Sequence, residues 1–169
     1  MKKYIKEIVI FIVVIFLATN IIGYFRSQNV KTNTILESLK SYKSIENQDI
    51  STLLEAKKPL IINFWGTWCP VCNQEVSTLS NLAKRDDITL LTIAVNSGSN
   101  QDIKNYMQKK DINFIVINDK DGKLANLANI SVYPTTIFFS SNRKSIIKDS
   151  GYTTKAGFLA RIKLLESKK

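Results

Sequence analysis

The only two cysteines of the 169-residue sequence, Cys69 and Cys72, form one Cys-x-x-Cys motif. The motif follows a mostly apolar run at residues 60–65 and precedes a segment with helical periodicity, so both sulfurs fall where a helix begins. Helix amides and the helix dipole favour a thiolate there, and the pair can close a disulfide. We therefore predict that Cys69 is the nucleophile. Cys72, one turn further in and more shielded, is predicted as the resolving thiol that releases the partner protein.

Other uses of a cysteine pair fit the composition less well. A closed zinc site needs about four ligands, and the chain has neither histidine nor a second cysteine pair. A static disulfide over so short a loop adds little stability. Two thiolates can bind Cu(I), so a tethered copper-binding or peptide-binding protein remains an alternative. We expect no metal and no cofactor beyond the redox-active disulfide itself.

The missing histidines and the charge pattern exclude further function classes. Without an imidazole the chain cannot use Ser-His-Asp or Cys-His catalysis. Its net charge of +10 could indicate binding to nucleic acid or to an anionic membrane surface. However, the lysines are scattered, and no basic run alternates with aromatic residues as a base-stacking groove requires. We expect no nucleic-acid partner.

An uncharged apolar segment occupies residues 8–25, between Glu7 and Arg26. As a helix rising about 1.5 Å per residue it would span roughly 27 Å, close to the thickness of a bilayer's hydrocarbon core. Lysines in residues 1–7 place the N-terminus in the cytoplasm under the positive-inside rule. The segment predicts one transmembrane anchor. A cleaved signal peptide is the alternative, although no convincing cleavage site follows.

The rest of the chain divides into a tether and one domain. Residues 26–41 are polar and predict a tether, with a short helix around residues 35–39. Residues 42–169 remain for the domain, which is long enough to bury a core without structural disulfides. No segment of the sequence suggests a dimerisation element, so we expect a monomer.

The predicted domain alternates strands and helices. Apolar runs at 60–65 and 88–95 are typical of strands covered on both faces, and a helical pattern between them completes a βαβ unit. The pattern predicts an α/β fold with a mixed central sheet and helices on both faces. The other predicted elements are helices near 50–56, 100–107, 124–128 and 158–165, an extended segment at 114–117, and an antiparallel strand pair at 135–139 and 145–149.

The residues around the cysteines, INFWGTWCPVC at 62–72, are similar to the active-site segment of membrane-anchored TlpA-like thioredoxin-fold proteins. Later landmarks of that family follow in order at residues 118–123, 132–136 and 151–154, so the resemblance covers roughly residues 50–165. The Cys-Pro-Val-Cys pair and the Gly-Tyr-Thr-Thr segment most resemble suppressor-of-copper-sensitivity D (ScsD-like) disulfide oxidoreductases. The resemblance implies a thioredoxin-like fold held at a bacterial inner (cytoplasmic) membrane, with the catalytic domain periplasmic or extracytoplasmic.

The resemblance also implies a substrate-binding surface. Pro134 would be cis and face the cysteines, and the backbone of Tyr133 would pair with a bound substrate strand. Tyr133 departs from the small or β-branched residue usual at this position. The remaining residues of the predicted surface are Trp68, which we expect to be partly exposed, together with Pro70, Val71 and Thr135.

Two polar residues bear on proton transfer. Asn63 stands where thioredoxin has a buried aspartate, and an amide cannot accept a proton. Glu75, one turn after Cys72, matches an acidic position of the family and is a candidate to assist deprotonation of Cys72, directly or through water. The alternative interpretation of Glu75 is an ordinary solvated glutamate on a helix surface.

The direction of electron flow is predicted from the residues between the cysteines. Strong oxidants stabilise their reduced thiolate, sometimes with a cationic neighbour in the motif, and none is present here. We expect an intermediate to reducing potential. The family resemblance favours a protein that a membrane electron conduit reduces and that passes electrons to oxidised thiols of exported proteins. The alternative is a thiol oxidant that introduces disulfides into such proteins.

Overall fold

The computed structural model describes residues 32–144 and 146–167, which belong to a compact unit starting at Lys31. Within these residues no helix combines the length and the hydrophobicity needed to cross a bilayer. The predicted cytoplasmic segment 1–7, the predicted anchor 8–25 and residues 26–31 of the predicted tether lie outside the described residues.

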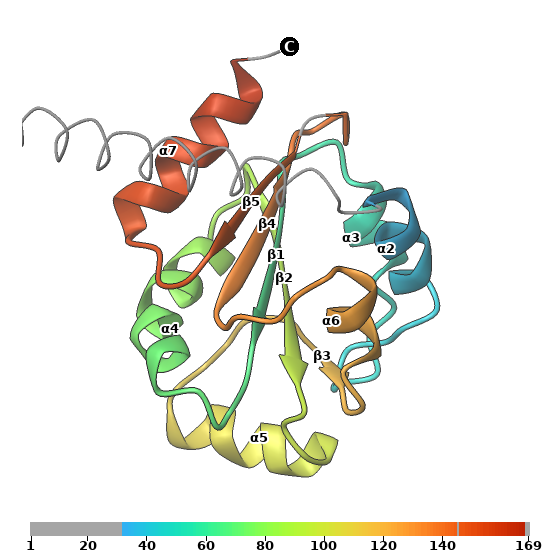
Figure 1. The fold of residues 1–169 in the computed structure, drawn as a ribbon, viewed down its shortest axis with the longest axis vertical. Coiled ribbons are helices and arrows are strands. Elements are labelled where there is room, and N and C mark those ends of the chain that lie inside the picture. The colour runs from blue at the N-terminus through green and yellow to red at the C-terminus, as the bar shows by residue number, and fades with distance from the viewer. Residues whose placement is uncertain (1–31, 145, 168–169) are drawn as a thin grey trace, which may run out of the picture. The chain divides into compact units, whose positions relative to one another are not determined.

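A five-stranded sheet forms the centre of the unit, in the order β3-β2-β1-β4-β5 (Figure 1). The central strand β1 (Leu60–Trp65) is parallel to β2 (Thr89–Val95), which is parallel to β3 (Val116–Asp119). On its other side β1 is antiparallel to β4 (Thr135–Phe139), and β4 is antiparallel to β5 (Ile146–Ser150). Every residue of β1 and β2 is buried, as the apolar runs predicted, and every residue of β4 is buried as well.

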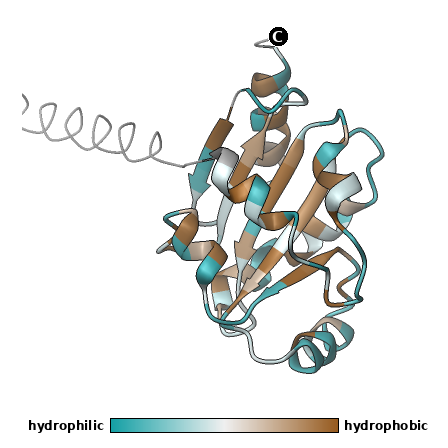
Figure 2. Ribbon diagram, turned by 90° about the vertical axis from the view of Figure 1, so that its right-hand side faces the viewer, coloured by the Kyte–Doolittle hydropathy of each residue, from teal (hydrophilic) through white to brown (hydrophobic). Residues whose placement is uncertain are grey.

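Helices cover both faces of the sheet, which confirms the predicted α/β architecture. In Figure 1, α4 and α7 lie on one side of the sheet, and α2, α3 and α6 lie on the other. Figure 2 shows hydrophobic strands enclosed by helices with hydrophilic outer turns. The helices are α2 (Thr32–Leu39), α3 (Ser51–Glu55), α4 (Pro70–Ala83), α5 (Asn100–Lys109), α6 (Lys123–Leu127) and α7 (Lys155–Glu166).

Helix α2 belongs to the folded unit rather than to a free tether. Ile35 and Leu39 are fully buried, and α2 packs against α6. Residues four apart lie on the same face of a helix, so these two side chains give α2 a narrow apolar stripe within a polar segment. The sequence predicted that the domain begins at residue 42, but the burial of α2 places its start earlier in the chain.

Three strands have boundaries that differ from the prediction. Strand β2 begins at Thr89 rather than at residue 88. Strand β3 covers Val116–Asp119 rather than residues 114–117, because Phe114 packs into the core without pairing to β2. Strand β5 ends at Ser150 rather than at residue 149, since its register pairs Ser150 with Thr135, and residue 145 lies outside the described residues. None of these differences moves an element that carries a predicted site residue.

Candidate active site

The cysteine motif lies where β1 ends and α4 begins. Cys69 is the N-cap residue of α4 and has an extended backbone, with φ −96° and ψ 107°. Pro70 occupies the start of the helix, where its fixed φ is suitable and its missing N–H has no intrahelical partner to lose. The Cys72 N–H donates to Cys69 Sγ at 3.1 Å. The sulfur of Cys69 thus lies at the positive end of a 14-residue helix, which favours a thiolate.

Cys69 and Cys72 form a disulfide with an S–S distance of 2.05 Å. The exposed fraction is 5% for Cys69 and 2% for Cys72. Both cysteines are therefore nearly buried, and the expected difference in shielding between them is small. The side chains around the disulfide therefore restrict access to the bond.

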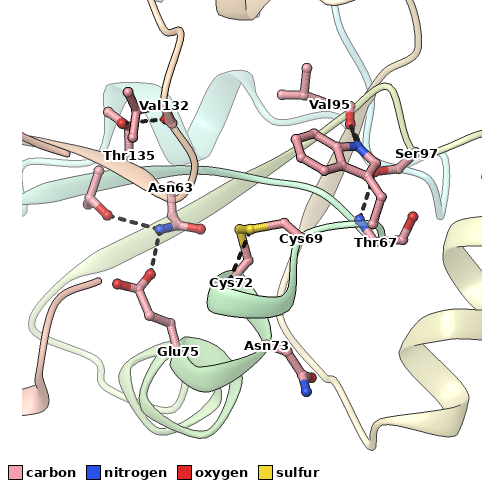
Figure 3. The surroundings of a disulfide bond; sticks show 12 residues. Asn63, Thr67, Cys69, Cys72, Asn73, Glu75, Val95, Ser97, Val132 and Thr135 are labelled. Atoms are coloured by element: carbon pink, nitrogen blue, oxygen red, sulfur yellow. Dashed lines mark hydrogen bonds between the residues drawn. A yellow bond between two sulfur atoms is a disulfide. The ribbon is translucent and has the colours of Figure 1, made fainter. Parts of the chain in front are cut away.

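Trp68 is held in one orientation beside the disulfide, while 52% of it remains exposed, in agreement with the prediction. Its indole N–H donates to the Val95 carbonyl at 3.0 Å (Figure 3). Its ring meets the Tyr133 ring edge-on, with centroids 5.3 Å apart. A Cβ atom on Gly66 would lie 2.6 Å from two indole atoms, so the indole can fold back only over a glycine. Trp65, in contrast, is a core residue.

The Tyr133–Pro134 peptide bond is cis, as the resemblance implied. The contact between the Trp68 and Tyr133 rings places this loop beside the cysteine motif. Exposed apolar side chains of Val71 and Val132 add to the same surface, with 42% and 51% of each residue accessible. Pro70 is exposed as well. The structure thus brings most of the predicted substrate-binding residues together.

Two of these predicted residues, Pro134 and Thr135, are buried, and the side chain of Thr135 points into the domain. It is 1% exposed, and its hydroxyl donates to the Val132 carbonyl at 2.7 Å (Figure 3). A second hydroxyl, that of Ser150, lies 3.1 Å away. As the first residue of β4, Thr135 is inside the sheet rather than in the exposed loop. It supports the cis-proline loop from within and does not line its surface.

Glu75 is fully buried, so the interpretation as a solvated glutamate is wrong. Its carboxylate accepts the backbone N–H of Thr153 and, at 3.2 Å, the Nδ2 of Asn63. Burial raises the pKa of Glu75 to about 7, although both hydrogen bonds lower it; the nearby charge of Asp149 adds to the increase. Glu75 is therefore a carboxyl group that can exchange a proton near neutral pH.

Asn63 connects this carboxylate to the centre of the sheet. It is fully buried on β1, and its Nδ2 also donates to Thr136 Oγ1 at 2.9 Å. Its Oδ1 is buried and has no hydrogen-bond donor among the residues that the structure describes. The sequence had indicated that this amide cannot accept a proton, but it did not reveal the contact with Glu75.

A loop at residues 151–154 links Glu75 to the cis-proline loop, and sequence reasoning missed this role. The Thr153 N–H donates to Glu75, while the Gly151 N–H donates to the Pro134 carbonyl at 2.7 Å. The Thr153 hydroxyl donates to Asp149 at 2.7 Å, and Asp149 pairs with Arg161 at 2.7 Å. The available signal was the Gly-Tyr-Thr-Thr landmark, which marked the segment without indicating its contacts.

No group of three or more acidic or cysteine side chains that could hold a metal ion occurs among residues 32–144 and 146–167. The acidic residue Asp119, which precedes the turn before α6, caps that helix. Its carboxylate accepts the N–H groups of Leu124 and Ala125 at 3.0 and 2.9 Å.

Comparison with known proteins places these features in a family context. The sequence model of the AhpC/TSA family matches residues 36–148. A thioredoxin-like protein of Haemophilus influenzae is 31% identical over 109 residues, 64% of this chain and 64% of that protein. The thiol-disulfide oxidoreductase ResA of Bacillus subtilis is 29% identical over 126 residues, 73% of this chain and 67% of ResA. The chain thus spans about two thirds of the length of these curated relatives.

A solved structure shows the same fold. The exposed lipoprotein thioredoxin Etrx1 of Streptococcus pneumoniae superimposes with a TM-score of 0.64 at 26% sequence identity, covering 73% of this chain and 97% of Etrx1. The described unit therefore has a thioredoxin-like fold, with the disulfide at the junction of its central strand and α4.

Proposed function

Because this chain belongs to the AhpC/TSA family, we propose that it is a thiol-disulfide oxidoreductase that exchanges electrons with partner proteins through Cys69 and Cys72. The observation that carries the proposal is the disulfide at the N-terminus of α4, beside a cis-proline loop. A thioredoxin-like relative and a relative named as a thiol-disulfide oxidoreductase support it.

In the proposed reaction the reduced protein acts on an oxidised partner. The Cys69 thiolate attacks a partner disulfide, forms a mixed disulfide and releases one partner sulfur as a thiolate. Cys72 then loses its proton and attacks Cys69 Sγ, which releases the second partner thiolate and restores the Cys69–Cys72 disulfide. Two electrons pass to the partner. Glu75, with a pKa raised to about 7 by burial, is the proposed acceptor of the Cys72 proton.

The proposed docking surface consists of the exposed side chains around the disulfide, namely Trp68, Pro70, Val71, Val132 and the half-buried Tyr133. We propose that an extended partner segment lies along the cis-proline loop and pairs with the backbone of Tyr133. Apolar side chains fixed in place lose little entropy on binding, so the surface suits an apolar segment next to the partner's cysteine.

The proposed setting follows from the sequence. Residues 8–25 anchor the chain in a bacterial inner membrane with residues 1–7 in the cytoplasm, and the domain acts on exported proteins outside that membrane. A membrane electron conduit reduces the disulfide, as the resemblance to TlpA-like and ScsD-like proteins suggests. The uncharged Pro70 and Val71 between the cysteines support a potential on the reducing side.

Alkylation trapping in intact cells tests the direction of flow. We expect most of the protein to carry free thiols at steady state while the membrane conduit works. A pool that stays mostly oxidised under those conditions would overturn the reductant role and support the alternative thiol oxidant.

The variant Cys72→Ser tests whether exchange occurs at all. It should accumulate mixed disulfides through Cys69, which identify the partners by mass spectrometry, and a Cys69→Ser, Cys72→Ser double variant is the control. A tethered Cu(I)-binding or peptide-binding protein would accumulate none, and that outcome would contradict the proposed enzyme.

A further inference from the structure

The side chain of Asn63 has one saturated end and one unsatisfied end. Its Nδ2 donates to Glu75 Oε2 at 3.2 Å and to Thr136 Oγ1 at 2.9 Å. Within residues 32–144 and 146–167 no group donates a hydrogen bond to its Oδ1, although the residue is fully buried. A buried acceptor without a donor destabilises the state in which it occurs. The disulfide form of the protein therefore carries an unmet acceptor in the middle of its central strand.

The unmet oxygen points toward the disulfide. Figure 3 shows the amide with its nitrogen toward Glu75 and its oxygen toward the sulfurs. The bond to Glu75 also places Asn63 against the face of α4 that carries Cys72, because residues three apart on a helix are neighbours. Rotating the amide by half a turn would set its oxygen, an acceptor, against the Glu75 carboxylate, which is also an acceptor. The orientation with Nδ2 toward Glu75 is therefore the favourable one.

Only reduction creates a proton donor at this position. A dithiol partner that reduces the bond gives up two electrons and two protons and becomes a disulfide, while the Sγ–Sγ bond of Cys69 and Cys72 breaks. In the disulfide form Cys69 Sγ accepts the Cys72 N–H at the start of α4, a position that favours a thiolate on Cys69 once the bond is reduced. One proton therefore stays on Cys72 as S–H, and the other passes to solvent.

We propose that Asn63 Oδ1 accepts a hydrogen bond from the Cys72 thiol in the reduced protein, and that this bond, absent from the disulfide form, raises the reduction potential. The inference rests on the proposed function and adds a positioning residue to it. Because the same amide binds Glu75 through Nδ2, it also holds the Cys72 proton next to the carboxylate that is to receive it.

Equilibration of the full-length chain with glutathione buffers tests the inference. Asn63→Leu removes the acceptor and should shift the equilibrium about tenfold toward the disulfide, which is about 30 mV for two electrons. The control Thr136→Val removes only a partner of Nδ2 and should shift it less than about twofold, since a neutral hydrogen bond common to both redox states cancels. Equal equilibrium constants for Asn63→Leu and the parent chain would overturn the inference.

A second background separates Asn63 from Glu75. In the Glu75→Gln background the carboxylate is absent. Any shift of the redox equilibrium that Asn63→Leu still causes there cannot act through that carboxylate. We expect the shift of about tenfold to persist there, because the proposed bond joins Asn63 Oδ1 to the Cys72 thiol and not to residue 75. If the shift disappears in this background, Asn63 acts through Glu75 and the inference fails.

The infrared S–H stretching band of the reduced chain gives a readout that needs no variant. The sequence has two cysteines, so with Cys69 ionised the band reports Cys72 alone. It should lie at lower frequency than in the urea-unfolded chain, and a band at equal or higher frequency would refute the bond. A disulfide that glutathione cannot reduce at any ratio would defeat the proposed function instead, so the two failures are distinguishable.

Discussion

The two sides of the Cys69–Cys72 disulfide have opposite surroundings. Toward solvent lie apolar side chains such as Trp68 and Val71, with exposed fractions of 52% and 42%. Toward the core lie the polar side chains of Asn63 and Glu75, with none of their surface accessible. Exposed apolar groups suit partner docking, and buried polar groups control protons and redox equilibrium. In the proposed mechanism the disulfide therefore lies between the surface that recognises the partner and the groups that transfer the proton.

The fold produces this contrast with few elements. The central strand β1 brings Asn63 beneath the motif, and the turn after it exposes Trp68. The loop at residues 151–154 touches both sides, because Thr153 donates to Glu75 and Gly151 donates to the carbonyl of cis Pro134. Variants on each side should therefore have separable effects, which assays with a large and a small disulfide substrate can distinguish.

The largest expected effect is on stability and belongs to the buried side. Burial raises the pKa of folded Glu75 from 4.5 to about 7, so the folded state binds this proton more tightly than the unfolded state. The group's contribution to stability is then greatest below pH 4.5 and is lost as pH rises through about 7. The unfolding free energy of the oxidised parent chain, minus that of Glu75→Gln, should fall by about 3 kcal/mol from pH 4 to pH 9.

Urea titrations of both oxidised chains across this pH range measure the difference. Groups that titrate in both chains cancel, and the exposed-site variant Glu55→Gln serves as the matched control because Glu55 lies on the surface of α3. Parallel stability curves for the parent chain and Glu75→Gln would show that Glu75 titrates normally, and the contrast between the two sides would weaken.

The second effect is on catalysis and also belongs to the buried side. Glu75→Gln cannot accept the Cys72 proton, so the mixed disulfide should resolve about 100-fold more slowly at pH 7, at the low end of general-base contributions. The loss should be equal for glutathione disulfide and for a disulfide-bonded apolar peptide. Acid-quenched single-turnover experiments measure the rate, and a loss confined to the peptide would place Glu75 in recognition instead.

The sequence was sufficient for elements whose signal is local. The apolar run at residues 60–65 gave β1 with the observed limits, because a strand buried on both faces is mostly apolar. The predicted strand at residues 135–139 also matches the limits of β4. The capping box of α5 is local in the same sense, since Ser99 and Asp102 lie only three residues apart. The cysteine motif likewise needs only neighbours in the chain to reach the start of a helix.

Features that depend on distant contacts could not be read in the same way. Glu75 follows a polar stretch of α4 and resembles a surface residue until Thr153, 78 positions later, supplies its hydrogen bond. Thr135 begins the segment predicted as a strand, but the sequence does not show which way its side chain faces, and at the start of β4 its hydroxyl points inward to the Val132 carbonyl. The buried stripe of α2 was hidden in the same manner, since its partner α6 lies far along the chain.

The third effect belongs to the exposed side. A methyl group at residue 66 would collide with the Trp68 indole at 2.6 Å, so Gly66→Ala should displace the indole from Tyr133 and the Val95 carbonyl. The rate constant for the reduced protein with the apolar peptide disulfide should fall about tenfold, or 1.4 kcal/mol. The rate with glutathione disulfide, which is too small to span the surface, should change less than about twofold.

Trp68→Ala is the matched comparison for Gly66→Ala. If both variants act by removing the indole from the surface, each should lower the peptide rate by a similar factor, and the double variant should be no slower than either single variant. Additive losses would mean that Gly66 acts on the motif by another route, such as the backbone of the turn before Cys69.

The smallest expected effect tests how far the docking surface extends. Val132 lies two residues before cis Pro134, and 51% of it is exposed, so Val132→Ser removes apolar area from the edge of the surface rather than from its centre. Peripheral contacts contribute little to binding, so the peptide rate should fall about two- to threefold, with the rate for glutathione disulfide unaffected.

Leu164→Ser on α7 is the control. Leu164 is an apolar residue with a similar exposed fraction, 53%, and it lies at the end of the domain away from the start of α4 (Figure 1). The substitution should leave both rates unchanged. Equal losses for Val132→Ser and Leu164→Ser would mean that general surface hydrophobicity, and not a defined surface around the disulfide, selects the partner.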